Sequence, residues 1–488
     1  MNGRVVPIHP QVELAPTASA TATGVPPLQH ATVQLPHYMR AGTLQLRALP
    51  PLALYLHMPW CLRKCPYCDF NSHEWRGSES VIPEERYVQA LIADLDVALP
   101  LIWGRRIASV FIGGGTPSLF SPDAIDALLT QVRARAALMP DAEITLEANP
   151  GTFERDRFAA YAQAGVNRLS IGVQSFDDAK LRVLGRIHDA RQARAAIEEA
   201  SRVVPTFNID LMFALPGQSL EQAVAEVRQA LAHEPPHLSL YQLTLEPQTP
   251  FAKRPPKQLP DGELAADMQL AVADAAQCAG LERYEVSAYA RPGHHSRHNR
   301  NYWEFGYYLG LGAGAHSKLS FAHRVIRQTR WRQPERYMQQ AMSGTAMQAE
   351  QEVTRRELPF EFMLNALRLR EINGWFPGFL FLWSGCRIAA AWSARTAASR
   401  AAGTIRRKEP VLLGSAPVAR SMSPTGLIFA RKNKPSQLPS KLVTNEPCAI
   451  STRCMRPTVP CGPITPATTS GWGRSRLWRC RPSARRRS

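Results

Sequence analysis

Short apolar runs alternate with helical patterns along the chain from residue 52 onward. Runs of six to eight residues predict strands at 52–58, 108–113, 143–148, 167–173, 206–213 and 237–243. Amphipathic segments between them predict helices, among them 83–99, 177–186 and 220–232. Successive strand–helix units predict an α/β protein with a parallel sheet flanked by helices. Six such units favour an open, partial (β/α)6 TIM-like barrel over a closed eight-stranded one.

Residues capable of chemistry fall where the predicted strands end. In barrels of this kind, the loops after the strands form one mouth, so these residues are expected to lie close together. A cysteine-containing loop follows the first strand, and the sequence GGGTPS follows the second. The polar residues associated with the next three strands are Glu147, Gln174 and Asp210.

Each of these signals also has a purely structural interpretation. Three glycines after a strand fit a tight turn, although they would also let backbone amides approach a ligand. Glu147 and Asp210 could cap helices or bind ribose hydroxyls or an ammonium group. Arg186 could be a surface arginine or a clamp for a carboxylate.

The most informative stretch is the loop that carries Cys61, Cys65 and Cys68. A Cys-x3-Cys-x2-Cys spacing supplies three thiolates, enough for three irons of a cubane cluster, and leaves the fourth iron open. A zinc site would need a fourth ligand such as His57 or His73, and zinc loops more often carry paired Cys-x2-Cys arms. Disulfides are disfavoured, because three clustered cysteines cannot all pair with one another. The spacing favours an open iron–sulfur site.

Composition changes the picture only at the two ends of the chain. Residues 1–48 are rich in Ala, Thr and Pro, without a signal-peptide pattern, and are predicted to be a disordered extension. No run of about 18 apolar residues is present, so no membrane span is predicted and the cytoplasm is the expected location.

The net charge of +18 arises entirely beyond residue 373. Residues 374–488 hold 20 Lys and Arg against two acids, whereas residues 1–373 hold 38 of each sign. A basic tail could bind nucleic acid through its charge. However, the amphipathic pattern of 359–371 stops abruptly, and no periodicity follows it. We therefore predict that residues 374–488 are a disordered basic tail translated out of frame, and we expect no specific nucleic-acid partner.

Residues 52–371 resemble the radical S-adenosylmethionine (SAM) superfamily, and within it the HemN/HemW group. The resemblance rests on six motifs: YLHMPWCLRKCPYCDFNSH (55–73), FIGGGTPS (111–118), LEANP (146–150), SIGVQSF (170–176), NIDLMFALPGQ (208–218) and HNRNYW (298–303). It implies a radical SAM barrel over 49–290, followed by an incomplete HemW-type C-terminal region over 291–373.

The resemblance also implies cofactors and their ligands. In this superfamily three cysteines hold a [4Fe–4S] cluster whose open iron binds the amino and carboxylate groups of SAM, and an electron from the cluster yields a 5′-deoxyadenosyl radical. By motif, the methionine end of SAM is expected to contact Tyr55, Gly114, Gly115 and Thr116. The rest of the SAM pocket is expected to comprise Glu147, Gln174, Arg186 and Asp210.

Two details separate the subfamilies. HemN-type oxidases carry a fourth cysteine two places after the third, and Phe70 occupies that place here. The HNRNYW segment resembles the signature of HemW-type haem chaperones, which implies that His298 handles haem, although a solvated polar loop is the plain alternative. The resemblance implies a chaperone that delivers haem to respiratory, membrane-bound acceptor proteins, with an electron donor for the cluster. Oxygen-independent coproporphyrinogen III oxidation is the alternative.

Overall fold

The computed structural model describes residues 35–42, 44–46, 49–76, 82–102, 104–151 and 155–371. The prediction that residues 374–488 are disordered and out of frame lies outside these residues. So does the predicted disorder of residues 1–34.

The centre of the fold is the parallel sheet that the apolar runs predict. The six expected strands lie side by side in chain order, and each pairs in parallel with the next. Their bounds are β1 (Leu52–Met58), β4 (Ile107–Gly114), β5 (Leu138–Ala148), β6 (Arg168–Gln174), β7 (Thr206–Phe213) and β8 (His237–Gln242). The predicted α/β class and unclosed barrel are confirmed.

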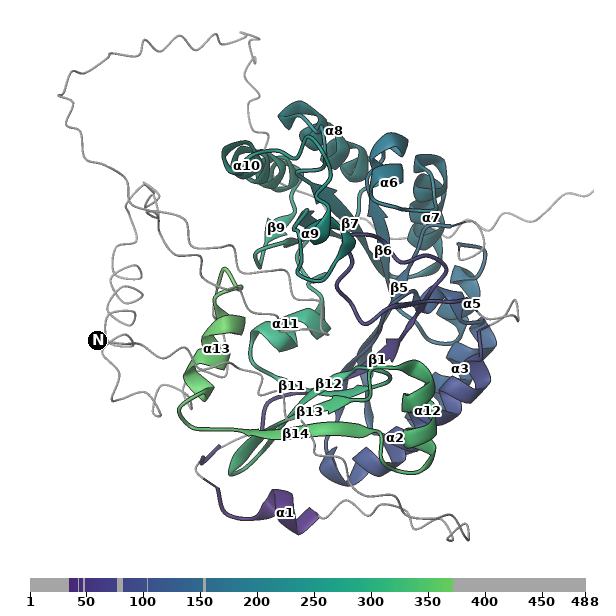
Figure 1. The fold of residues 1–488 in the computed structure, drawn as a ribbon, viewed down its shortest axis with the longest axis vertical. Coiled ribbons are helices and arrows are strands. Elements are labelled where there is room, and N and C mark those ends of the chain that lie inside the picture. The colour runs from purple at the N-terminus through teal and green to yellow at the C-terminus, as the bar shows by residue number, and fades with distance from the viewer. Residues whose placement is uncertain are drawn as a thin grey trace, which may run out of the picture. The chain divides into compact units, whose positions relative to one another are not determined.

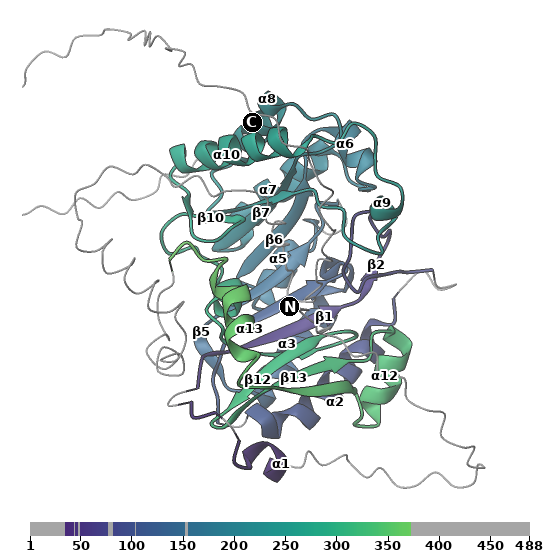
Figure 2. The same ribbon diagram turned by 60° about the vertical axis from the view of Figure 1, so that its left-hand side comes forward.

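The sheet continues at both edges, with twelve strands in the described chain. On the β8 side it adds β10 (Ala288–Ala290) and β9 (Glu282–Arg283). On the β1 side it adds β11 (Tyr307–Leu311), β12 (His316–Phe321), β13 (Arg324–Arg330) and β14 (Met347–Val353). β11 pairs in parallel with β1, whereas the following pairs are antiparallel. The region after residue 290, predicted as a separate part, therefore extends the same sheet (Figures 1 and 2).

Helices that connect the parallel strands cover the outer side of the sheet (Figure 1). Several begin at a side-chain cap that satisfies a free backbone N–H, such as Ser121, Asp189 and Ser219. The helices between the parallel strands are α2 (Glu84–Ile102), α3 (Pro122–Arg135), α5 (Phe158–Gln163), α6 (Asp178–Val183), α7 (Ala190–Val203) and α8 (Leu220–Leu231). Two further helices lie elsewhere in the chain: α10 (Gly262–Cys278) follows β8, and α12 (Pro334–Met342) lies between β13 and β14.

Short elements complete the fold around the strand ends. α11 (Arg297–Trp303) contacts β4, β1 and α13 (Leu358–Ala366). The remaining elements are β2 (Trp60–Cys61), β3 (His73–Glu74), the 3-10 turn η1 (Pro117–Leu119) and α9 (Pro250–Lys253).

The predicted disorder of residues 1–48 is wrong for the segment that precedes β1. A short helix, α1 (Leu35–Met39), places Tyr38 in a stack with Phe321, with ring centroids 5.4 Å apart. The Leu44 amide then donates to the carbonyl of His323 over 3.1 Å, and its side chain is buried. Burial of these two side chains and hydrogen bonds from Arg324 Nη2 to the carbonyls of Arg40 and Ala41, 3.1 Å each, hold this segment against the sheet.

The core is built from the apolar faces of the strands and of the helices that cover them. α2 shows the pattern, because Leu91 and Leu95 are fully buried one turn apart while the opposite face is exposed. No helix in the described part of the chain is long and apolar enough to cross a membrane.

Candidate functional site

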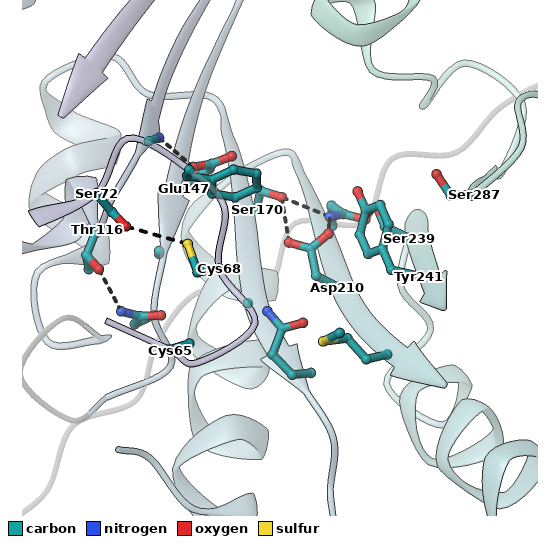
Figure 3. A pocket seen from close by; sticks show the side chains of 18 of the residues that line it. Cys65, Cys68, Ser72, Thr116, Glu147, Ser170, Asp210, Ser239, Tyr241 and Ser287 are labelled. Atoms are coloured by element: carbon teal, nitrogen blue, oxygen red, sulfur yellow. Dashed lines mark hydrogen bonds between the residues drawn. The ribbon is translucent and has the colours of Figure 1, made fainter. Parts of the chain in front are cut away.

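A polar cavity of about 270 Å³ lies on the inner side of the sheet. Alternate residues of the central strands line it, as expected from the two-residue period of a β-strand. The lining residues of β6 are Arg168, Ser170, Gly172 and Gln174; those of β7 are Asn208, Asp210 and Met212; and those of β8 are His237, Ser239, Tyr241 and the terminal Gln242. The cavity therefore runs along the strands from their beginnings to their ends (Figure 3).

The cysteine loop closes one end of this cavity. Cys61, Cys65 and Cys68 all line it, and none forms a disulfide. Hydrogen bonds fix the loop: the Cys68 amide donates to the carbonyl of Cys65 over 3.1 Å, and Lys64 Nζ donates to the carbonyls of Phe70 and Ser72 over 3.0 Å each. The spacing of three cysteines thus brings three sulfur ligands to one cavity.

Burial favours the protonated thiol at two of the three cysteines, Cys61 and Cys68. Burial raises the pKa of Cys61 to about 11 and also raises the pKa of Cys68, whereas hydrogen bonds from Thr116 and Ser72 oppose these shifts. Cationic iron beside the sulfurs would reverse this preference, because a bound metal deprotonates its thiol ligands. Arg186 Nη1 lies 3.8 Å from Cys65 Sγ and adds positive charge at the loop. This donor set fits an iron–sulfur cluster.

A zinc site on the same loop is less well supported. No three His, Cys, Asp or Glu side chains among the described residues are arranged around a single ion. In a cubane each cysteine binds its own iron, so the sulfurs need not converge on one point. Both ring nitrogens of His57 are also committed, to Tyr55 Oη at 2.9 Å and to the Asn71 carbonyl at 3.0 Å, so His57 is no zinc ligand.

The carboxylates of Glu147 and Asp210 face the middle of the cavity (Figure 3). Asp210 accepts hydrogen bonds from Asn208 Nδ2 at 2.7 Å and from Ser170 Oγ at 3.2 Å. Burial raises the pKa of Glu147 to about 8, the N–H of Gly114 opposes the shift and the negative charge of Asp210 adds to it. Burial also raises the pKa of Asp210. Both residues lie inside strands, so the alternative that they cap helices is wrong.

Arg186 and Gln174 border the same end of the cavity as the cysteines. Arg186 is not a surface arginine: its Nη2 donates to the carbonyl of Gly172 over 2.8 Å and to the side-chain oxygen of Asn149. Gln174 lines the cavity with a φ of +67°, in the left-handed region. That conformation turns the chain sharply at the end of β6.

The backbone N–H groups of the GGGTPS turn are hydrogen-bonded within the protein. The N–H of Gly114 donates to Glu147, that of Gly115 to the Met58 carbonyl at 2.7 Å, and that of Thr116 to the Trp60 carbonyl at 2.8 Å. These N–H groups already have partners in the protein, so their contact with a ligand stays a prediction that would require exchange of these hydrogen bonds. The Thr116 side chain lines the cavity and accepts a hydrogen bond from Asn149 Nδ2 over 3.1 Å.

Tyr55 and His298 do not line the cavity. Tyr55 is fully buried and packs against Ala315 and against Phe111, which itself lines the cavity. His298 is also fully buried; its ring centroid lies 4.8 Å from that of Phe111 and 5.1 Å from that of Tyr302. Direct contact of either residue with a ligand would require movement of the side chains that cover it.

Several residues of the cavity were not anticipated from the sequence. These unanticipated lining residues include Asn149, Ser170, Asn208 and Tyr241. The alternation within SIGVQ and NIDLM could have identified Ser170 and Asn208, because residues two apart on a strand face the same way. Trp303, the last residue of the HNRNYW motif, also lines the cavity, whereas no local signal marks Glu285 or Arg368, which reach the cavity from later parts of the chain.

Comparison with known proteins places this site in a family context. Residues 55–230 match the model of the radical SAM superfamily. The chain is 51% identical over 325 residues to the haem chaperone HemW of Escherichia coli, covering 66% of this chain and 84% of that protein. It is 47% identical to HemW of Haemophilus influenzae, with the same coverage. It is 45% identical to the mouse mitochondrial radical SAM domain-containing protein 1, covering 55% of this chain and 60% of that one.

A likeness in structure agrees with the fold. The coproporphyrinogen III oxidase HemN of Escherichia coli matches with a TM-score of 0.61 and 24% identity, covering 72% of this chain and 83% of that one. At that identity the likeness describes the fold alone.

Proposed function

Because this chain belongs to the HemW family of the radical SAM superfamily, we propose that it is a haem chaperone, which binds haem and delivers it to haem-requiring acceptor proteins. The observation that carries the proposal is the 51% identity to a haem chaperone over 84% of that protein's length. Membership of the superfamily implies a [4Fe–4S] cluster and SAM.

We assign the cluster to Cys61, Cys65 and Cys68, which all line one end of the cavity. When bound, the cluster and SAM together supply one-electron radical chemistry. The protein's part is to orient SAM: Thr116, Gln174 and Arg186 border the cysteine end, where the cationic Arg186 would hold a carboxylate.

Glu147 and Asp210 border the middle of the cavity and offer acceptors for hydroxyl or ammonium groups. Gly114 and Gly115 hold the turn in place through their N–H groups, which donate to Glu147 and to the Met58 carbonyl. Tyr55 remains a proposed SAM residue that acts through Phe111, against which it packs.

His298 is our proposed haem ligand. Burial lowers the pKa of its ring to about 3, so the imidazole is neutral and keeps a lone pair at physiological pH. Its Nδ1 is hydrogen-bonded with Ser109 Oγ at 3.2 Å, and its Nε2 has no partner among the described residues. A free nitrogen opposite a hydrogen-bonded one suits an axial iron ligand. Haem access requires α11 to move away from Phe111.

The oxidase alternative has weaker support. Oxygen-independent coproporphyrinogen III oxidation would fit the fold, but the likeness to HemN extends only to the fold. The place of a fourth cysteine is taken by Phe70, which lines the cavity. Respiratory membrane-bound acceptors, an electron donor for the cluster and a cytoplasmic location remain predictions.

Two parallel assays on the anaerobically reconstituted chain test the proposal. The first measures haem binding by absorbance and haem transfer to an acceptor apoprotein; the second measures turnover of coproporphyrinogen III. We expect stoichiometric haem binding and transfer without turnover. Turnover with no haem transfer would instead support the oxidase.

The role of His298 is tested by His298→Ala, with the exposed His323→Ala as the matched control. We expect the first variant to weaken haem binding at least about tenfold while the second binds normally. Equal binding by both variants would remove His298 from the haem site.

A further inference from the structure

Arg168 lies at the end of the cavity far from the cysteines. It is the first residue of β6, whereas Gln174, at the cysteine end, is the last. Six residues of strand at about 3.3 Å each separate their backbones by roughly 20 Å. Arg168, Ser170, Gly172 and Gln174 alternate along one face of the strand, and all of them line the cavity.

This arginine differs from the other buried arginines of the described chain, because it has no ion-pair partner there. Its side chain is only 2% exposed. The other arginines with comparable burial all contact a carboxylate: Arg324 with Glu352 at 3.3 Å, Arg330 with Asp94 at 3.1 Å and Arg368 with Glu285 at 3.0 Å. A guanidinium stays charged in a protein, so an unpaired buried one is costly to the fold.

The hydrogen bonds of Arg168 are also incomplete. Nη1 donates weakly to Thr206 Oγ1 at 3.4 Å and to the His294 carbonyl at 3.3 Å. Nη2 is buried and has no hydrogen-bond acceptor among the described residues. A buried charged donor without an acceptor is rare in native proteins and points to a missing partner.

The nearby carboxylates are committed to other groups. The positive charge of Arg168 lowers the pKa of Asp210, but the Asp210 carboxylate accepts its hydrogen bonds from Asn208 and Ser170. Glu285 accepts from Arg368 and from Ser287 Oγ at 2.7 Å. Glu143 accepts from the backbone N–H groups of Arg297 and His298. None of these three carboxylates forms an ion pair with Arg168, so its guanidinium is left for a ligand.

We propose that Arg168 forms an anion subsite at this end of the cavity, which takes the carboxylate of a bound ligand. A planar carboxylate matches a guanidinium, and its single charge balances the single unpaired arginine. A phosphate dianion would need more positive charge than this end offers, because Arg368, the other arginine there, is neutralised by Glu285. Ser296 and Asn299 line the same cavity and supply neutral polar groups.

The carboxylate has two candidate sources, a small organic acid or a propionate of haem; the second rests on the proposed function. Two ligand comparisons on the reconstituted full-length chain separate them. One titrates propionate and records binding by calorimetry. The other compares haem with haem dimethyl ester, in which the propionates carry no charge. Each is repeated with Arg168→Gln and with the exposed control Arg254→Gln.

Because Arg168→Gln removes a charge-assisted contact, it should weaken binding of the carboxylate ligand about 10- to 100-fold. If the source is a small acid, propionate binds the native chain and Arg254→Gln but not Arg168→Gln. If it is haem, the native chain prefers haem to the diester at least tenfold, and Arg168→Gln loses that preference. No propionate binding together with no preference for haem over its ester in the native chain would overturn the proposal, and this comparison needs no variant. A chain that binds no haem contradicts the proposed function, whereas the propionate titration still decides the subsite.

Stability gives a readout that a structural role would not produce. Removing an unpaired buried charge should leave the ligand-free chain as stable as the native one or more stable, as measured by chemical denaturation. Arg168→Lys keeps the positive charge but loses the two parallel N–H donors of the guanidinium, so it should retain part of the carboxylate binding. Arg168 would instead serve the fold if two results came together. Arg168→Gln would be strongly destabilised, and all variants, including Arg168→Lys, would still bind the carboxylate as the native chain does.

Discussion

The backbone N–H of Gly114 donates a hydrogen bond of 2.9 Å to Oε2 of Glu147. This contact joins the ends of β4 and β5 at the cavity and ties the glycine turn to a buried carboxylate. A glycine is required here, because the backbone adopts a φ of +123° and a Cβ would lie 2.6 Å from Cε1 of His57.

Replacement of Gly114 by alanine should therefore destabilise the chain. Backbone strain and the clash with a fully buried histidine together predict a loss of roughly 2–5 kcal/mol. Urea denaturation of the purified variant measures it. Gly262→Ala is the matched control, because a Cβ at that position meets nothing within 4 Å. Equal effects of the two substitutions would contradict this account of the turn.

The raised pKa of Glu147 predicts a specific dependence of stability on pH in the cofactor-free chain. Burial raises this pKa from 4.5 to about 8, so between these pH values the folded state holds a proton that the unfolded state has lost. The stability that protonated Glu147 adds to the folded state is fully present below pH 4.5 and is lost as the pH rises to about 8. Over this range the free energy of unfolding should fall by at most about 1.4 kcal/mol per pH unit. In Glu147→Gln this part of the decline should disappear from denaturation curves recorded across the range. A parallel pH profile for the two proteins would count against a protonated Glu147.

Breaking the buried ion pair between Arg330 and Asp94 should destabilise the chain far more than breaking an exposed pair does. Arg330 Nε lies 3.1 Å from Asp94 Oδ2, both side chains are 3% exposed, and the Tyr337 hydroxyl donates to the same carboxylate oxygen over 3.0 Å. Asp94→Asn leaves a buried charge unpaired and should cost about 3–5 kcal/mol. Glu335→Gln, which breaks the exposed pair with Arg86, should cost less than about 1 kcal/mol. Chemical denaturation measures both, and similar values would contradict the assignment.

The three cysteines of the loop should each be needed for the cluster. Replacement of Cys61, Cys65 or Cys68 by serine removes one of three thiolate ligands at the same cavity, so iron and sulfide per chain should fall severalfold after anaerobic reconstitution. The control is Cys278→Ser, because Cys278 is exposed at the end of α10. Retention of a full cluster by any of the three loop variants would remove that cysteine from the ligand set.

Much of the barrel could be predicted from the sequence because its signals are local. β1 and β7 have the predicted bounds, and the other central strands differ mainly at their ends. β5 begins at Leu138, five residues before its predicted start, because Leu138 pairs with Ile107 of β4. The strands after residue 303 were not predicted individually. β12 and β13 mix Lys, Arg, Ser and Thr with few apolar positions, and pairing with neighbouring strands decides their structure.

The sequence by itself determined the α/β class, the order of the central strands and the three cysteines after β1, because strand period and cysteine spacing are properties of neighbouring residues. Only the tertiary structure decided how individual polar groups are used. It assigned the amides of the glycine turn to the protein itself and buried Tyr55 and His298 against Phe111. It also left Arg168 without an ion-pair partner among the described residues while pairing Arg368 with Glu285. The physical reason is that burial and hydrogen bonding depend on residues brought together from distant parts of the chain, which no local pattern encodes.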